Sequence, residues 1–362
     1  MKDKQLKRVL IMAGGTGGHV FPGLAVAHYL RDHQVDVHWL GTSKGLESRL
    51  VPEAGIPLHL INIWGVRGKG IKTLLAAPFK ISKAIWQAKR IIDEVNPDVI
   101  LGLGGFVSGP GGIASWLSRR PLVIHEQNAK AGFTNKVLAR FARKVLAGFP
   151  GAFPARANVF TIGNPVRHEI ENLPVPEERL CPVRQPLHLL VLGGSLGAQA
   201  LNEIVPHALA KLAINERPEV LHQTGDKHMD AAKNVYQSMN IEANVTAFVK
   251  DMANAYAWAD IVICRAGALT ISELCSAGLG AVLVPFPHAV DDHQTANAQF
   301  MTNHQAAYCL QQRELTAEQL ADIVKKFVKS PDECLAMAKA AYSLRNVQVT
   351  KKIFDILADV VK

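Results

Sequence analysis

Residues 8–19 read RVLIMAGGTGGH, and this stretch decides the fold. Its apolar part, Arg8–Ala13, predicts a buried β-strand, because strands that are covered on both faces read as short continuous apolar runs. The glycines that follow permit a tight turn, and a helical pattern starts near Pro22. A strand, a glycine turn and a helix in this order are typical of a βα unit in a parallel α/β sheet.

The turn Gly14–His19 predicts a phosphate site. Glycines let the backbone approach a ligand closely, and the N–H groups and dipole of the following helix favour an anion. The turn is not the G-x-G-x-x-G fingerprint of dinucleotide-binding proteins, because Val20 stands where the third glycine counted from Gly15 should be. It also lacks the G-K-[ST] ending of a P-loop.

His19 closes this turn and is a candidate general base. A histidine titrates near neutral pH, and this one lies in a strand-to-helix loop, where catalytic groups are often found. A histidine in such a place can instead simply bond to a backbone carbonyl. Its position favours the catalytic role.

The same design recurs along the chain. Short apolar runs alternate with helical patterns, and the runs of the first half are Arg8–Ala13, Val35–Leu40, Asp98–Leu103, Leu122–His125 and Lys144–Ala147. The runs of the second half are Leu187–Leu192, Val220–Gln223, Val245–Phe248, Ile261–Cys264 and Ala281–Pro285. This alternation predicts an α/β protein with two Rossmann-like, doubly wound domains.

The domain boundary is expected in a proline-rich stretch. Residues 163–186 contain five prolines and no sustained apolar periodicity, which predicts an extended linker. We therefore expect an N-terminal domain over residues 1–162 and a C-terminal domain over residues 187–340. Residues 341–362 predict a last helix that could pack on either domain, including back on the N-terminal one. The apolar positions of that helix are Ile353, Ile356, Leu357 and Val360.

Three more glycine-rich loops follow predicted strands: Gly102–Gly112, Gly193–Ala198 and Arg265–Glu273. Ligands of doubly wound sheets bind outside the carboxyl ends of the strands, where these loops should lie. Any one of them could be only a tight structural turn, but together they favour a phosphorylated ligand. In the last loop, Glu273 either stabilises a helix terminus or accepts hydrogen bonds from ribose hydroxyls.

Two polar clusters complete the candidate site. The first, His125–Asn128, directly follows a predicted strand. Because neighbouring strand residues point to opposite sides, His125 and Glu126 need not act as a pair. The second, residues 285–297, contains two histidines and two aspartates, but their spacing matches no recognised set of metal ligands. We therefore expect polar sugar contacts there and no metal site.

The charge of the chain is unevenly distributed. Residues 1–162 hold 22 Lys and Arg against 9 Asp and Glu, a formal charge of +13, whereas residues 163–362 hold 18 against 22, a charge of −4. This asymmetry indicates that the N-terminal half faces phospholipid headgroups, a phosphorylated substrate or nucleic acid. The five cysteines form no C-x-x-C pair, which argues against structural zinc or disulfides and fits a reducing cytoplasm.

A membrane-facing segment is expected within residues 69–90. No stretch of the sequence has the roughly 18–20 consecutive apolar residues of a spanning helix, so any membrane contact should be peripheral. Cations mixed with large apolar side chains suit an anionic bilayer surface, where each cation adds about 1 kcal/mol of binding. The alternative is an amphipathic helix that packs inward. The candidate membrane patch is Lys72, Leu75, Phe79, Lys80, Lys83 and Trp86, with Trp116 as a weaker candidate.

In their order and spacing, six motifs resemble the MurG family of bacterial glycosyltransferases. They are G-G-T-G-G-H at 14–19, G-G-F-V-S-G-P-G-G at 104–112, H-E-Q-N at 125–128, G-N-P-V-R at 163–167, G-G-S-L-G-A at 193–198 and C-R-A-G-A-L-T-I-S-E at 264–273. The resemblance covers nearly the whole chain. It implies transfer of N-acetylglucosamine from UDP-GlcNAc to undecaprenyl-pyrophosphoryl-MurNAc-pentapeptide, lipid I, which gives lipid II for peptidoglycan.

The resemblance also implies an architecture and a location. The architecture is glycosyltransferase-B, with two Rossmann-like domains facing a cleft, the acceptor mainly on the first and UDP mainly on the second. The enzyme would need no cofactor and would act peripherally at the cytoplasmic face of the inner membrane. Proteins of cell-wall synthesis or cell division would be its candidate partners.

The resemblance further implies residue roles. Arg167 and Ser195 would serve the diphosphate, Val249 the uracil through its backbone, and Gln294 the sugar. Glu273 would bind the ribose, and His19 resembles the proposed base of the family, with Glu126 and a water-mediated route as alternatives. The implied donor contacts are Thr16, Gly17, Gly18, Asn128, Arg167, Ser195, Val249, Ala268, Leu269, Thr270, Ile271, Ser272, Glu273 and Gln294. Ala266 and Gly280 depart from the serine and proline expected there, which bears on local turn geometry.

The residue types suit this chemistry. UDP is already a good leaving group, so the reaction needs neutralisation of diphosphate charge and deprotonation of the acceptor hydroxyl, not the two flanking carboxylates of a hydrolase. We expect direct displacement at the anomeric carbon with inversion. His19 or a nearby carboxylate would assist, and helix amino termini with Arg167 would replace a metal.

Two other functions are compatible with parts of the pattern. A UDP-GlcNAc 2-epimerase of the same architecture could share the nucleotide loops but would not need a lipid-facing patch. A basic nucleic-acid-binding protein is disfavoured, because aromatic residues make up only 6% of the chain and no recognition motif is present.

Overall fold

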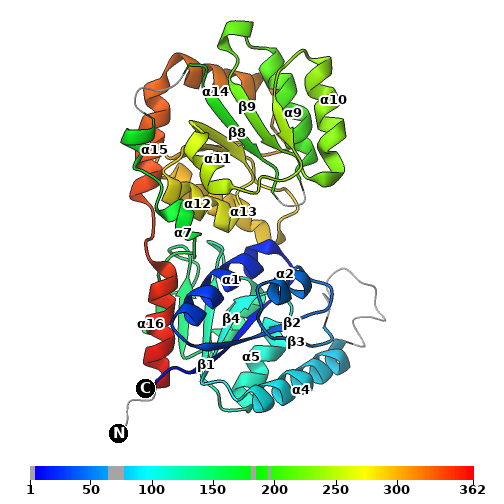
Figure 1. Cartoon of the computed structure of the whole chain (residues 1–362), viewed down its shortest axis with the longest axis vertical. Helices are drawn as coiled ribbons and strands as arrows, with labels where there is room; N and C mark the ends of the chain where they lie inside the picture. Colours follow the sequence, from blue (N-terminus) through cyan, green and yellow to red (C-terminus); the bar gives the residue numbers. More distant parts are fainter. Residues whose placement is uncertain (1–4, 64–76, 181–184, 195–196) are drawn as a thin grey trace. The chain divides into compact units, whose positions relative to one another are not determined.

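The computed structural model describes residues 5–63, 77–180, 185–194 and 197–362. The chain forms two compact units: unit 1 comprises residues up to Pro165 together with Gln348–Lys362, and unit 2 is Val166–Val347. Each unit contains one sheet flanked by helices (Figure 1). The two doubly wound sheets that the sequence predicts are thus present.

Unit 1 has a seven-stranded sheet in the order β3-β2-β1-β4-β5-β6-β7, and each neighbouring pair is parallel. Its strands are β1 (Arg8–Ala13), β2 (Asp36–Gly41), β3 (Leu58–Leu60), β4 (Val99–Gly104), β5 (Leu122–Glu126), β6 (Lys144–Ala147) and β7 (Val159–Thr161). Its helices are α1 (Gly17–Asp32), α2 (Glu47–Glu53), α4 (Ala77–Val95), α5 (Ser108–Leu117), α6 (Phe133–Leu138) and α16 (Val349–Val361).

Strand β1 contributes to two hydrophobic cores on opposite faces of the sheet. Val9 and Ile11 lie in the core that includes α1 and α16, whereas Leu10 and Met12 lie in the core that includes the buried face of α4. All four side chains are fully buried. Burial on both faces explains why this strand reads as a continuous apolar run.

Unit 2 has a six-stranded sheet in the order β10-β9-β8-β11-β12-β13, again parallel in each pair. Its strands are β8 (His188–Leu192), β9 (Glu219–Gln223), β10 (Asn244–Thr246), β11 (Ile261–Cys264), β12 (Ala281–Leu283) and β13 (Ala307–Cys309). Its helices are α7 (His168–Glu171), α8 (Pro176–Arg179), α9 (Gln199–Ala210), α10 (Met229–Ser238), α11 (Met252–Trp258), α12 (Ala268–Ala277), α13 (His293–Thr302), α14 (Ala317–Lys329) and α15 (Pro331–Ser343).

Every strand predicted from the sequence is present, with its ends shifted by at most two residues. Three strands were not predicted: β3, β7 and β13. Each has three residues and lies at an edge of its sheet. An edge strand this short carries too few apolar residues to form a recognisable run.

The prediction of an extended linker over residues 163–186 is wrong. Its described part is not an extended connector, because it contains α7 and α8, which pack on α11, α12 and α15 of unit 2. Arg179 anchors it by donating hydrogen bonds to the carbonyls of Tyr256, Ala277 and Gly278. The prolines therefore interrupt helices without separating this segment from the domain.

The last helix, α16, belongs to unit 1 although the chain enters it from unit 2. Gln348 adopts a left-handed conformation (φ 55°) immediately before the helix. Val349, Ile353 and Leu357 are fully buried in the core that also contains residues of α1. Figure 1 shows α16, in red, beside α1, in blue. The predicted boundary at residue 340 falls inside α15, so the change of unit occurs several residues later than expected.

Truncation of Ile353 should destabilise unit 1. We expect Ile353→Ala to lower the free energy of unfolding by about 2–5 kcal/mol, because it removes a fully buried side chain and leaves a cavity beneath α16. Urea denaturation measures this loss. Lys352→Ala in the same helix changes an exposed residue and should have little effect. Equal stability of the two variants would contradict the docking of α16.

Candidate functional site

Each sheet has one topological switch point, where the strand order reverses. It lies between β1 and β4 in unit 1 and between β8 and β11 in unit 2. Ligands of open α/β sheets bind outside the carboxyl ends of the strands at such points. The loops that follow these four strands are the four glycine-rich loops of the sequence: Gly14–His19, Gly102–Gly112, Gly193–Ala198 and Arg265–Glu273.

At the switch point of unit 1, two loops meet backbone to backbone. Gly105 has a φ of +83°, and a Cβ atom on it would lie 2.2 Å from the carbonyl oxygen of Gly14. Glycine is therefore required at position 105 for both its conformation and its size. The loops after β1 and β4 consequently lie in direct contact.

His19 lies at this contact, in the first turn of α1. A Cβ atom on Gly104 would come within 2.7 Å of His19 Nε2, so the imidazole ring lies against the Gly104 backbone. Ser108 holds that backbone by accepting a hydrogen bond from Gly104 N–H at 3.0 Å and donating one to Gly104 O at 2.8 Å. Thr16 and Gly18 are exposed and Gly17 is half-buried, so the amino end of α1 is accessible to an anion.

Glu47 belongs to this site although no sequence motif pointed to it. Its buried carboxylate accepts hydrogen bonds from Gly15 N–H at 2.9 Å and from the N–H and hydroxyl of Thr42 at 2.9 and 2.7 Å. One side chain thus connects the turn after β1, which is the predicted phosphate site, to the loop after β2. The only available signal was that Glu47 is the sole acid between Asp36 and Glu53.

Glu126 is fully committed to neighbouring donors. One carboxylate oxygen accepts from the backbone and side-chain N–H groups of Asn128, each at 3.1 Å, and the other from Gly132 N–H and Asn135 Nδ2 at 3.0 and 2.9 Å. A carboxylate offers about four acceptor positions, and these four bonds fill them. This geometry favours a structural role for Glu126 and disfavours it as the base. It also uses one N–H of the Asn128 side-chain amide.

His125 joins the same end of β5 to the chain near residue 163. Its Nε2–H donates to Gly163 O at 2.9 Å, and its Nδ1 accepts from Gln127 Nε2 at 3.1 Å. Burial holds the pKa of His125 below its ordinary value, so the ring is neutral in this tautomer. Asn164 adds a bond from its Nδ2 to Gln127 O at 3.0 Å. His125 and Glu126 therefore have separate partners and do not form a dyad.

In unit 2, Gln223 at the end of β9 joins two of the predicted donor segments, those of Gly194 after β8 and Val249 after β10. Its Nε2 donates to Gly194 O at 3.1 Å, and its Oε1 accepts from Val249 N–H at 2.9 Å. The predicted uracil contact through the Val249 backbone is thereby restricted, because the N–H is already bonded and the carbonyl oxygen remains as the contacting group. Ser195, the predicted diphosphate contact in the first loop, lies outside the described residues.

Helix α12 presents its amino end at the switch point of unit 2. Gly267 precedes the helix and has no side chain with which to cap it, so the first N–H groups can serve an anion. The side chain of Ile271 is fully buried and that of Ser272 bonds to Ala268 O at 3.0 Å. Of the predicted contacts 268–272, the backbone groups of the first turn and the partly exposed side chains of Leu269 and Thr270 are therefore the available ones. Ala266 stands where the family resemblance implies a serine. Its backbone carbonyl accepts a hydrogen bond from Asn297 Nδ2 at 3.1 Å, a contact that does not depend on the side chain at position 266.

Glu273 and Arg167, predicted to bind different parts of the donor, bond to each other. Arg167 Nη2 and Nε donate to Glu273 Oε1 at 2.8 and 3.2 Å, and the hydroxyl of Tyr256 donates to Oε2 at 3.0 Å. Arg167 is half exposed, whereas the Glu273 side chain is only 16% exposed. Gln294, the predicted sugar contact, lies at the start of α13, and its Oε1 accepts from Phe286 N–H at 2.8 Å.

The described part of the candidate membrane patch is exposed. Phe79 and Trp86 are 78% and 63% exposed, and Lys80 and Lys83 are also on the surface of α4. Trp116 on α5 is exposed as well. Lys72 and Leu75 lie outside the described residues. Within the part of the chain that the structure describes, no helix combines the length and apolar character needed to span a bilayer.

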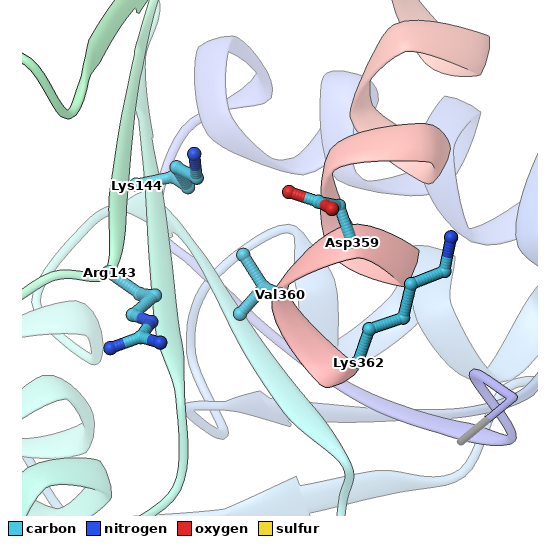
Figure 2. Close-up of a pocket in the computed structure, with 5 residues that line it drawn as sticks. All are labelled: Arg143, Lys144, Asp359, Val360 and Lys362. Carbon is cyan, nitrogen blue, oxygen red and sulfur yellow. The ribbon is translucent and has the colours of Figure 1, made fainter. Parts of the chain in front are cut away.

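A hollow of about 370 Å³ in unit 1 lies away from the switch point. Arg143, Lys144, Asp359, Val360 and Lys362 line it, and Figure 2 shows Asp359 and Val360 facing the start of β6. This is the amino end of that strand, the opposite end of a parallel sheet from the glycine loops. Among the described residues, no three His, Cys, Asp or Glu side chains are grouped closely enough to hold a metal ion.

Models of glycosyltransferase family 28 match both units. The N-terminal domain model matches residues 9–147, and the C-terminal domain model matches residues 188–353.

Individual proteins match over nearly the whole chain. The UDP-N-acetylglucosamine–N-acetylmuramyl-(pentapeptide) pyrophosphoryl-undecaprenol N-acetylglucosamine transferase of Marinobacter nauticus is 52% identical, with 98% of each chain covered. The transferase of the same name from Aeromonas hydrophila is 51% identical, with 96% of each covered. The crystal structure of Acinetobacter baumannii MurG is similar with a TM-score of 0.85 and 41% identity, covering 98% of this chain and 99% of that one.

Removal of the Glu47 charge should loosen the turn that carries His19. Glu47→Gln replaces one acceptor oxygen with an N–H donor that faces another donor, so we expect a loss of about 1–3 kcal/mol of stability. Amide hydrogen exchange at Gly15 and Thr42 should accelerate in the variant. Glu53→Gln changes an exposed carboxylate in the same helix and serves as the control. Unchanged exchange at both amides would refute the role given to Glu47.

Proposed function

The chain belongs to the MurG transferases of glycosyltransferase family 28, and from this membership we infer its reaction. It transfers N-acetylglucosamine from UDP-GlcNAc to undecaprenyl-pyrophosphoryl-MurNAc-pentapeptide, lipid I, and so forms lipid II in peptidoglycan synthesis. The glycosyltransferase-B fold expected from the sequence agrees with the two parallel sheets and with the match to the Acinetobacter enzyme.

The observation that carries the donor assignment is the pairing of an anion site and a carboxylate on α12. The amino end of the helix can receive a diphosphate, and Glu273 follows five residues after Ala268, about 7.5 Å along the helix axis. A nucleoside diphosphate presents its ribose hydroxyls and its diphosphate at a comparable separation. Unit 2 is therefore proposed to bind the UDP part of the donor, with Val249 O at the uracil and Gln294 near the sugar.

We propose that the reaction is a single displacement. The acceptor hydroxyl oxygen attacks the anomeric carbon, the bond from that carbon to the diphosphate breaks, and UDP leaves with inverted configuration at the sugar. Negative charge grows on the diphosphate as the bond breaks, and helix N–H groups with Arg167 stabilise it. Because this charge is neutralised by the protein's own groups, the proposal assigns no metal to the step.

His19 is the proposed base that takes the proton from the acceptor hydroxyl. It lies at the switch point of unit 1, beside the accessible amino end of α1, where the pyrophosphate of an acceptor could bind. The main alternative residue, Glu126, already fills its acceptor positions with four N–H donors. The geometry therefore supports His19 over Glu126. Thr16, Gly17 and Gly18, which the resemblance implies as donor contacts, are proposed here as contacts to the acceptor's pyrophosphate instead.

A transfer assay with a labelled donor tests this reaction. Wild-type protein should convert UDP-GlcNAc and a lipid I analogue to the disaccharide with EDTA present, and His19→Ala should lower the rate by about 10²–10⁴-fold while retaining UDP affinity. His28→Ala, an exposed histidine of the same helix, is the control. Epimerised or unchanged UDP-sugar without disaccharide would overturn the assignment. A rate that EDTA abolishes would instead overturn only the metal-free step.

We also propose that α4 brings unit 1 to the cytoplasmic surface of the inner membrane, where a lipid-linked acceptor is found. Phe79 and Trp86 expose large apolar surfaces on a helix that also exposes Lys80 and Lys83. Aromatic side chains can enter the interfacial region while lysines contact anionic headgroups. This surface is consistent with the +13 charge of the first 162 residues.

Vesicle flotation tests the membrane surface. The double variant Phe79→Ala, Trp86→Ala should bind vesicles containing phosphatidylglycerol at least tenfold more weakly than wild type, because it loses the apolar area proposed to insert. The control is Ile214→Ala, which removes an 80% exposed apolar side chain from unit 2. Undiminished vesicle binding by the double variant would show that α4 is not the membrane contact.

A further inference from the structure

The two oxygens of the Glu273 carboxylate have partners of different kinds. Oε1 accepts from Arg167, the residue that precedes the short helix α7, and the side chain of Arg167 is 47% exposed. Oε2 accepts from the Tyr256 hydroxyl at 3.0 Å, and Tyr256 on α11 is 1% exposed. One partner is therefore accessible to a ligand, and the other is enclosed in the core of unit 2.

We propose that Tyr256 is a positioning residue for ribose recognition, because its buried hydroxyl fixes the Glu273 carboxylate in the orientation that receives the ribose hydroxyls. This inference rests on the proposed donor site and adds a residue to it. No sequence motif singled out Tyr256, and it does not itself contact the donor in this arrangement.

A carboxylate that accepts two neighbouring hydroxyls must hold its plane in a defined direction. Glu273 has three side-chain torsions, so without a fixed partner it would sample several orientations and lose entropy when a ribose binds. The Tyr256 ring has two torsions and is enclosed by the core, so its hydroxyl stays in place. Tyr256 thus prepares the carboxylate before the donor arrives.

The Tyr256 hydroxyl is suited to this task because it remains a donor. Burial, together with the neighbouring Glu273 carboxylate, raises the pKa of Tyr256 well above its ordinary value, so the hydroxyl keeps its proton. The bond from Arg167 to Glu273 is not expected to persist in the same way, because the exposed guanidinium of Arg167 is also the proposed partner of the diphosphate. When that diphosphate binds, Arg167 can exchange Oε1 for phosphate oxygens and release Oε1 to the ribose.

The proposal predicts selective recognition of the sugar of the nucleotide. Glu273 held by Tyr256 should favour UDP over 2′-deoxyuridine diphosphate, because the deoxy compound lacks one of the two hydroxyls. Loss of the Tyr256 hydroxyl should weaken binding of UDP more than that of the deoxy compound, which keeps only one of the two hydroxyls that Glu273 accepts. A residue needed only for folding would instead affect both nucleotides equally.

The test is calorimetric titration of full-length wild-type and variant proteins with both diphosphates. Tyr256→Phe should weaken UDP binding by about tenfold and binding of 2′-deoxyuridine diphosphate by about threefold or less. In the transfer assay, the KM for UDP-GlcNAc should rise while kcat stays within about twofold. Adding Tyr256→Phe to Glu273→Gln should cause no further loss of UDP affinity, because the hydroxyl acts through that carboxylate.

Tyr236→Phe is the matched control. Tyr236 on α10 is also buried in unit 2 and belongs to its hydrophobic core. Its hydroxyl, however, bonds to His222 Nδ1 at 2.9 Å and not to Glu273. Its variant should leave the ratio of the two affinities unchanged.

Three results would overturn the inference: equal weakening of both diphosphates by Tyr256→Phe, no weakening of UDP binding, or a wild-type protein without a preference for UDP. Failure of the proposed function gives a different result, since a protein that binds UDP selectively yet forms no disaccharide would retain the role of Tyr256 and lose only the transferase assignment.

Discussion

Direct contact between backbones at the carboxyl ends of the strands is the constraint on which the rest of the structure depends. At the switch point of unit 1 a Cβ atom on Gly105 would lie 2.2 Å from Gly14 O. In unit 2 a Cβ atom on Gly197, after β8, would lie 2.2 Å from the O atom of Thr224, after the neighbouring β9. No side chain fits at either place, so the loops can close over the carboxyl ends of the strands. The helices that follow then start close to the carboxyl ends of the strands. Their first N–H groups lie at the position where a phosphate is expected.

Buried polar side chains hold these loops in place, because loop backbone groups lack the regular partners of strands and helices. Glu47 accepts N–H donors from two separate loops, and Glu126 accepts several from the one stretch that follows β5. Gln223 needs both halves of its amide, since it donates to one loop and accepts from another. Glu273 differs from these residues because one of its partners is exposed. The interactions that hold the loops and those proposed to bind the ligand are therefore carried by different side chains.

The sequence could predict what local patterns encode. Strands such as Arg8–Ala13 and the glycine turns after them were recognisable, because burial on both faces and positive φ angles restrict residue type. Contacts between distant segments were not predictable in the same way. Glu47 and Tyr256 carry no motif, and their importance arises only when the fold brings Gly15 and Glu273 beside them. The linker was misjudged because prolines that begin or end short helices resemble prolines of an extended chain.

Helix α16 gives the first unit a core built from both ends of the described chain, and this has a consequence for biosynthesis. A ribosome adds residues 349–361 only after the whole of unit 2, and domains near the amino terminus generally fold first. Until α16 emerges, the apolar side chains of α1 that pack near Ile353 and Leu357 have no cover. The first unit would therefore remain partly unfolded during synthesis, with exposed apolar side chains that chaperones can recognise. A prematurely terminated polypeptide that lacks α16 would keep those side chains exposed.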